Sequence, residues 1–116
     1  MAQSTNSLEE SWNRLAYAVP TTMAPQSGAV TVDCSPDQGS IKRRMTLNGD
    51  VTSWTINNLP DGGEVILEFI HDGTDRAMAD PSFANTPPFT TLTAALSGAE
   101  WVIKNVAGTM RFVNGG

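Results

Sequence analysis

Residues 41–72 read IKRRMTLNGDVTSWTINNLPDGGEVILEFIHD and decide the fold of this 116-residue chain. Apolar and polar residues alternate in three runs within the stretch, at residues 41–47, 51–56 and 64–70. Asn48-Gly49-Asp50 separates the first two runs, and a segment rich in Asn, Pro and Gly separates the second from the third. Alternation between such turn segments is typical of half-buried antiparallel strands. The sequence therefore predicts an antiparallel meander at the centre of an all-β domain.

Further strands are predicted on both sides of this meander. Residues 29–34 (AVTVDC) alternate and form a first strand, while residues 100–105 and 109–113 flank Val106-Ala107-Gly108 and form a closing hairpin. Together they predict a β-sandwich or meander domain over residues 28–116.

A proline-rich loop precedes the hairpin at residues 80–91, where proline excludes a central strand. Phe83 and Phe89 lie within it. We expect the two rings to pin an ordered loop, and we treat both residues as candidates for contact with a partner.

The N-terminal part, residues 1–27, has a different pattern and is predicted to serve docking or oligomerisation. It combines a polar arm, a helix over residues 8–19 and a linker over residues 21–28. Ser7 and Glu10 form a capping box at the start of the helix, and Pro20 ends it. An apolar stripe at helical spacing is made by Leu8, Trp12, Leu15, Ala16 and Val19. A helix this short is marginal alone in water, so the stripe must dock on its own domain, on a partner or on another copy.

Three residues on the predicted strands have a side chain that the simple inside–outside alternation does not explain. Ile66 and Ile70 lie on the face of their strand opposite Val65 and Leu67, so both faces are partly apolar, which predicts either a central strand or one whose second face meets a neighbouring subunit. Arg43 falls on the apolar side of its strand. Either its stem covers apolar surface while its head reaches water, or the register changes locally.

Composition excludes several classes of protein. The net charge of −5 argues against a nucleic-acid partner. The exception is the basic cluster Lys42-Arg43-Arg44, which could contact an acidic partner surface, although a solvated strand face is the commoner explanation. No stretch is apolar and long enough to span a membrane, and residues 1–8 lack the features of a secretory signal. The single cysteine, Cys34, allows no internal disulfide, and we expect it to be a small apolar residue at a strand end.

The chain offers weak material for catalysis or for a cofactor. His71 and Asp72 are adjacent on a strand, so their side chains point to opposite faces and do not form a catalytic pair. Asp72, Asp75 and Asp80 could gather around calcium, but their spacing fits no EF-hand loop. Trp12, Trp54 and Trp101 could line a sugar-binding face, although a core or interface role is commoner for such residues. We predict no enzyme, no cofactor and no metal.

The order of turns resembles a small β-sandwich module that recurs in tailed-phage virion proteins, namely tail fibres, head fibres and capsid decoration proteins. The resemblance covers residues 28–115. Two departures are His71, where the family usually has a polar amide, and Asp80-Pro81, where it usually has Trp-Pro. The segments that carry the resemblance are residues 47–52 (LNGDVT), 58–63 (NLPDGG), 71–76 (HDGTDR) and 108–113 (GTMRFV).

The resemblance implies a non-enzymatic structural protein of a phage virion, made in the host cytoplasm. The first expectation is a capsid decoration (cement) protein or the base of a head fibre, bound to the major capsid protein or another virion protein through its N-terminal segment. A homotrimer is expected. The alternative is a receptor- or carbohydrate-binding module of a tail fibre or baseplate.

Overall fold

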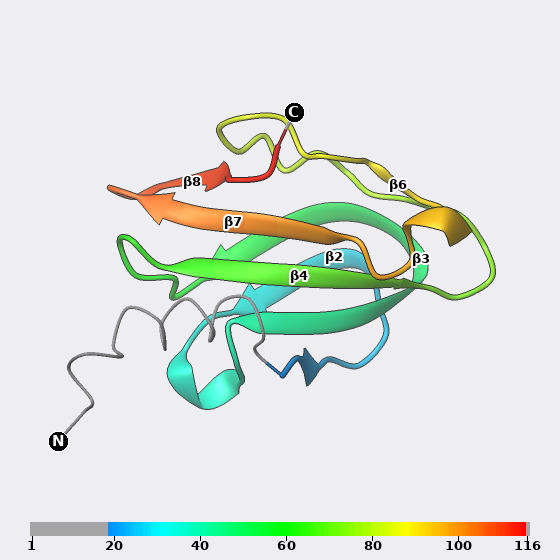
Figure 1. The fold of residues 1–116 in the computed structure, drawn as a ribbon, viewed down its shortest axis with the longest axis horizontal. Coiled ribbons are helices and arrows are strands. Elements are labelled where there is room, and N and C mark those ends of the chain that lie inside the picture. The colour runs from blue at the N-terminus through cyan, green and yellow to red at the C-terminus, as the bar shows by residue number, and fades with distance from the viewer. Residues whose placement is uncertain (1–18, 116) are drawn as a thin grey trace, which may run out of the picture.

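The computed structural model describes residues 19–115, and strands dominate this part of the chain (Figure 1). Two short 3-10 helices, η1 (Pro36–Gln38) and η2 (Ala94–Leu96), lie in connections between strands. The all-β class predicted from the alternating runs is therefore confirmed. The strands are β1 (Thr21–Thr22), β2 (Gln26–Asp33), β3 (Lys42–Asn57), β4 (Glu64–His71), β5 (Arg76–Ala77), β6 (Thr91–Leu92), β7 (Glu100–Val106) and β8 (Thr109–Phe112).

Six of these strands form one mixed sheet in the order β1-β3-β4-β7-β8, with β2 paired to the second half of β3. β4 runs parallel to the first half of β3, with Leu67 opposite Arg43. On its other side β4 is antiparallel to β7, where Leu67 lies opposite Trp101. The predicted antiparallel meander is therefore wrong, because the first and third alternating runs pair in parallel.

The course of β3 explains this difference. The runs predicted over residues 41–47 and 51–56 belong to one strand of 16 residues. It curves out of the layer of β4 and β7 into the layer of β2 (Figure 1). A two-residue hairpin needs positive φ angles, and neither Gly49 nor either neighbour has one. The second half of β3 acts instead as the crossover that returns the chain to start a parallel strand.

Gly49 is needed at this bend for space rather than for an unusual backbone angle. A Cβ atom at this position would lie 2.8 Å from the Cβ of Ser27, a separation that side chains do not tolerate. Glycine thus lets β2 approach the bend of β3 closely.

Aromatic side chains join the two layers. Trp54, on the second half of β3, has its ring centroid 5.0 Å from that of Trp101 on β7 and 5.7 Å from that of Phe69 on β4. Phe112 of β8 packs edge-on against Trp101 at 5.1 Å. Each such ring buries about 150–250 Å², so this cluster dominates the core. Trp54 and Trp101 are core residues, as the commoner interpretation of their alternating positions predicts, and are 8% and 0% exposed.

The closing hairpin is present as predicted. β7 and β8 are antiparallel, and Val106 lies opposite Thr109 at the turn. Ala107 and Gly108 both have positive φ, at 52° and 89°, as a tight two-residue hairpin turn requires.

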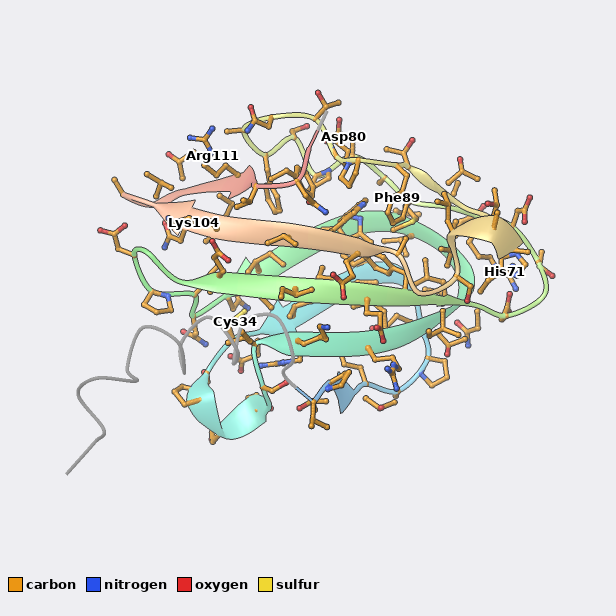
Figure 2. All side chains as sticks on the ribbon, viewed as in Figure 1. Cys34, His71, Asp80, Phe89, Lys104 and Arg111 are labelled. Atoms are coloured by element: carbon orange, nitrogen blue, oxygen red, sulfur yellow. The ribbon has the colours of Figure 1, made fainter. Side chains whose placement is uncertain are left out.

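The loop over residues 80–91 is pinned by its two phenylalanine rings, also as predicted. The Phe83 ring lies 5.7 Å from the Phe112 ring, and the Phe89 ring lies 6.0 Å from the Phe69 ring. Figure 2 shows Phe89 directed into the molecule from this loop. Because both rings pack against the core of their own domain, each side chain is half-buried, and only its remaining surface can contact a partner.

The segment predicted as a linker, residues 21–28, belongs to the sheet. β1 pairs in parallel with Arg43 and Arg44, and β2 already begins at Gln26, opposite Leu47. The turn-forming residues do not form a loop here. They produce an irregularity in the pairing of β2 with β3, whose register shifts on both sides of Gly28. The described part of residues 1–27 is thus attached to the β domain, while the division at residue 28 stays a prediction.

Candidate functional site

A pocket of about 680 Å³ lies at the end of the sandwich where β2 and β3 finish and β4 begins. We call this the pocket end, and we call the opposite end, where residues 71–76 turn, the turn end. Figure 2 shows Cys34 at the first and His71 at the second. The pocket is mainly apolar and is lined by Cys34, Pro36, Gly39, Ser40, Ile41, Arg43, Asn58, Leu59, Pro60, Gly63, Glu64 and Val65.

Asp33 fixes one wall of this pocket. Its Oδ1 accepts hydrogen bonds from the Ser35 amide (3.0 Å), the Ser35 hydroxyl (2.7 Å) and the Asn58 side-chain amide (2.9 Å). The Asn58 hydrogen bond, followed by those from Ser35, lowers the pKa of Asp33 to about 2. The carboxylate therefore ties the end of β2 to the residue that follows β3.

Asn105 of β7 fixes the opposite wall. Its side-chain amide donates to the Leu59 carbonyl (2.7 Å), and its Oδ1 accepts from the Gly108 amide (2.8 Å). The backbone of Asn105 also exchanges hydrogen bonds with Gly62 and Gly63. Asn105 is 8% exposed, and a buried polar side chain needs hydrogen-bond partners. The backbone groups of Leu59 and Gly108 supply them.

Arg43 is a buried charged residue of this pocket. It is 4% exposed, and its Nε donates a 2.7 Å hydrogen bond to the Ser40 carbonyl. The ion pairs formed among the described residues do not include Arg43, although Glu64 also lines the pocket. The sequence left two explanations open for Arg43: a head that reaches water, or a local change of register. The pairing of β3 with β4 is regular at Arg43, and the guanidinium stays inside. A buried cation without an ion pair is costly, which makes this position one that favours an acidic partner.

The basic cluster predicted on this strand is divided between two faces. Lys42 forms an ion pair with Glu100 at 3.2 Å, and Arg44 forms one with Glu68. Both pairs lie on the outward face of the sheet, opposite to Arg43. Two members of the cluster are therefore engaged with carboxylates of their own domain.

Ile66 and Ile70, the predicted contact with another subunit, lie on this outward face of β4. Ile66 is 5% exposed between its neighbours Lys42 and Val102, and Ile70 is half-buried. Ile66 is outside the cluster of core residues, although it is buried. Contact of this face with a second copy stays a prediction.

The N-terminal segment leaves the domain at the rim of the pocket. The Ser40 hydroxyl donates to the Val19 carbonyl (2.8 Å), and the Ser40 amide donates to the Thr21 hydroxyl (2.9 Å). Val19 itself is 82% exposed and is not helical. The other predicted residues of the stripe, Leu8, Trp12, Leu15 and Ala16, lie outside the described residues.

Cys34 lines the pocket as a half-buried residue just after β2. Burial raises the pKa of its thiol, because the apolar surroundings disfavour the thiolate. This agrees with the prediction of a small apolar residue at a strand end and gives no sign of an activated nucleophile.

At the turn end, two pairs of side chains bind one another, while the Nε of Arg76 is buried without a hydrogen-bond partner among the described residues. The His71 Nδ1 accepts from the Gly73 amide (3.1 Å), so Nε2 carries the proton and donates to Asp75 at 2.9 Å. Asp72 instead pairs with Arg76 at 2.8 Å, which lowers the pKa of Asp72 and raises that of Arg76. The prediction that His71 and Asp72 do not pair is confirmed.

The three aspartates weighed as calcium ligands each have a separate partner. Asp80 accepts from the Ser82 amide at 2.8 Å, while Asp72 and Asp75 bind Arg76 and His71. Within residues 19–115, no group of three or more His, Cys, Asp or Glu side chains is placed to hold a metal ion. Among the same residues, no helix has the length and apolar character needed to cross a membrane.

Comparison with protein-family models, curated proteins and solved structures found no match. Sequence reasoning had singled out two residues of the pocket, Arg43 by its position on an apolar face and Cys34 as the single cysteine. It missed the pocket itself, because the walls come from two stretches, residues 34–43 and 58–65, that meet only in the folded domain.

Proposed function

We propose that the chain is a non-enzymatic structural protein of a phage virion, a capsid decoration (cement) protein or the base of a head fibre. It binds the major capsid protein or another virion protein through its N-terminal segment. The observation that carries the proposal is the position of Val19. This residue is 82% exposed and is held by Ser40 at the rim of the pocket, so the chain N-terminal to it continues from the pocket end of the described domain.

The placement of the turns that resemble phage virion modules supports this proposal. Residues 58–63 and 71–76 lie immediately before and after β4, and residues 107 and 108 form the turn between β7 and β8. These turns connect strands without carrying a reactive group into a cleft. A compact domain of this kind serves as a scaffold for an attachment segment.

The polar groups of the domain favour binding over catalysis. His71 and Asp75 bind each other on the exposed side of a turn, and Asp72 is neutralised by Arg76. Cys34, the one residue with nucleophilic chemistry in the pocket, has a raised pKa. None of these three sites pairs a nucleophile with a base, which is the arrangement that covalent catalysis requires.

For the alternative, a receptor- or carbohydrate-binding module of a tail fibre or baseplate, the four tryptophan and phenylalanine residues considered within residues 19–115 offer no exposed aromatic face. Trp54 and Trp101 are buried in the core, and Phe83 and Phe89 pack against it. Sugar binding through stacked aromatic rings needs exposed ring faces. We therefore place this function second.

A homotrimer is the assembly that we propose for the virion. Ile66 and Ile70 lie on the outward face of β4, flanked by the Lys42–Glu100 and Arg44–Glu68 ion pairs. A small apolar strip edged by charge pairs suits a modest interface between copies.

Deletion of residues 1–18 tests the proposed attachment. The truncated chain should keep a cooperative thermal transition, because the strands and the core lie within residues 19–115. Its co-sedimentation with capsids of the parent phage should fall to background, while the full chain sediments in high copy number. The matched control is Asp75→Asn at the turn end, which should bind like wild type. A truncated chain that still decorates capsids would contradict the proposal.

A further inference from the structure

The pocket end combines three features that together call for an occupant. The pocket has a volume of about 680 Å³, within the range of about 300–1,000 Å³ that binding pockets have. It contains the buried Arg43 without an ion pair among the described residues. Its rim holds Val19 and Thr21 through Ser40, so the chain outside the described residues begins at the pocket.

The sequence of that outside segment matches the pocket in chemistry. Leu8, Trp12 and Leu15 share one stripe at helical spacing, and a buried tryptophan ring alone covers about 150–250 Å². Glu9 follows Leu8 and lies at the edge of the stripe, about 100° around a helix of 3.6 residues per turn. Glu10 lies about 200° from Leu8, away from the stripe. The segment therefore offers an apolar face with a carboxylate beside it.

We propose that the pocket is the docking site of the chain's own N-terminal segment, with the stripe Leu8, Trp12 and Leu15 in the pocket and Glu9 on the Arg43 guanidinium. Connectivity favours the chain's own segment over that of a second copy. The segment is joined to the rim at Val19, so its effective concentration at the pocket is in the range of about millimolar or above. Val19 is exposed and takes no part in this contact.

This inference goes beyond the proposed function, because it concerns the isolated chain and needs no capsid. It also decides between the alternatives that the sequence left open for the stripe. A stripe docked on its own domain leaves residues 1–6 and the polar face with Glu10 and Arg14 directed away from the pocket. These are then the parts of the segment available to a virion partner.

Alkylation of Cys34 tests the docking directly, because Cys34 is the single cysteine and lines the pocket. In the full chain, Trp12→Ala should raise the rate of alkylation by iodoacetamide by about tenfold, since it removes the largest anchor. Tyr17→Ala is the matched control, because Tyr17 lies about 180° from Leu8 on the helix. It should leave the rate unchanged. All variants should react equally in urea, which removes any difference in intrinsic reactivity.

A second pair of variants tests the charge. Glu9→Gln should raise the alkylation rate, whereas Glu10→Gln should not, although both remove one carboxylate from the same turn. Methyl NMR gives an independent readout that does not depend on thiol chemistry. The Ile41, Leu59 and Val65 methyl signals should shift in Trp12→Ala and keep their wild-type positions in Tyr17→Ala.

Two results would overturn the proposal. Equal alkylation rates and unchanged methyl shifts in wild type, Trp12→Ala and Tyr17→Ala would mean that the segment does not occupy the pocket. Protection of Cys34 that weakens on dilution of the wild-type protein would assign the pocket to the segment of another copy.

Discussion

The two ends of the sandwich differ in whether their charged side chains find partners within the described domain. At the turn end, the side chains of residues 71–76 bind within their own loop, through the His71–Asp75 hydrogen bond and the Asp72–Arg76 ion pair, although the Arg76 Nε has no hydrogen-bond partner among the described residues. At the pocket end, Arg43 is buried in an apolar pocket without an ion pair among the described residues. β4 joins the two, with Val65 lining the pocket and Phe69 packed in the aromatic core. The difference indicates that side chains at the turn end find partners within their own loop. The buried cation at the pocket end has no such partner, so we expect a segment outside the described residues to supply one.

The largest effect is expected from the aromatic core on which both ends rest. Trp101 is fully buried, lies 5.3 Å from the Phe69 ring and donates a hydrogen bond from Nε1 to the Phe89 carbonyl at 3.1 Å. Trp101→Ala should lower the free energy of unfolding by about 3–5 kcal/mol, because it leaves a large cavity. Urea unfolding followed by circular dichroism measures this loss. A loss below that of the next variant would mean that the core does not support the two ends.

A smaller effect is expected from loosening the pocket end alone. Asn105→Ala removes the hydrogen bonds to the Leu59 carbonyl and from the Gly108 amide, which leaves buried groups unpaired. It should cost about 1–3 kcal/mol in the free energy of unfolding. Hydrogen exchange should show faster opening of residues 59–63 and unchanged opening of residues 71–76. Equal acceleration at both ends would contradict the independence of the two ends.

The smallest effect is expected from acid titration at the pocket wall. Because hydrogen bonds lower the pKa of Asp33 to about 2, from an unfolded value of about 3.9, its ionised form stabilises the folded state. This contribution is complete above the unfolded pKa and is lost as the pH falls through the folded pKa. Asp33→Asn should therefore flatten the pH dependence of stability between about pH 4 and pH 2. Urea titrations at several pH values measure it, and an unchanged slope would contradict the assigned hydrogen bonds.

The strands and their inward faces could be predicted from the sequence because alternation is a local property. Val65, Leu67 and Phe69 are inward-facing and buried, as their spacing predicts, and the hairpin at Ala107-Gly108 follows from its turn chemistry. The parallel pairing of β3 and β4 could not be predicted in this way. Local alternation does not specify a partner strand, and Asn48-Gly49 looks like a hairpin turn unless the contact with Ser27 is known.

The candidate site could be predicted only in part. Arg43 stood out because a cation on an apolar strand face conflicts with the pattern around it. The pocket depends on Cys34, Leu59 and Val65 meeting at one end of the fold, and no spacing in the sequence brings them together. The stripe of Leu8, Trp12 and Leu15 was predicted from helical spacing, and its need for a docking surface followed from its short length.

The claim that the pocket end, and not the turn end, faces the virion partner is tested most directly by hydrogen exchange of the full chain, free and bound to capsids. Exchange reports the protection of backbone amides segment by segment. With the stripe docked in the pocket of the free chain as proposed, we expect binding to slow exchange mainly at residues 1–18 and to leave residues 71–77 unchanged. Slower exchange at residues 71–77, with none at residues 1–18, would contradict the claim.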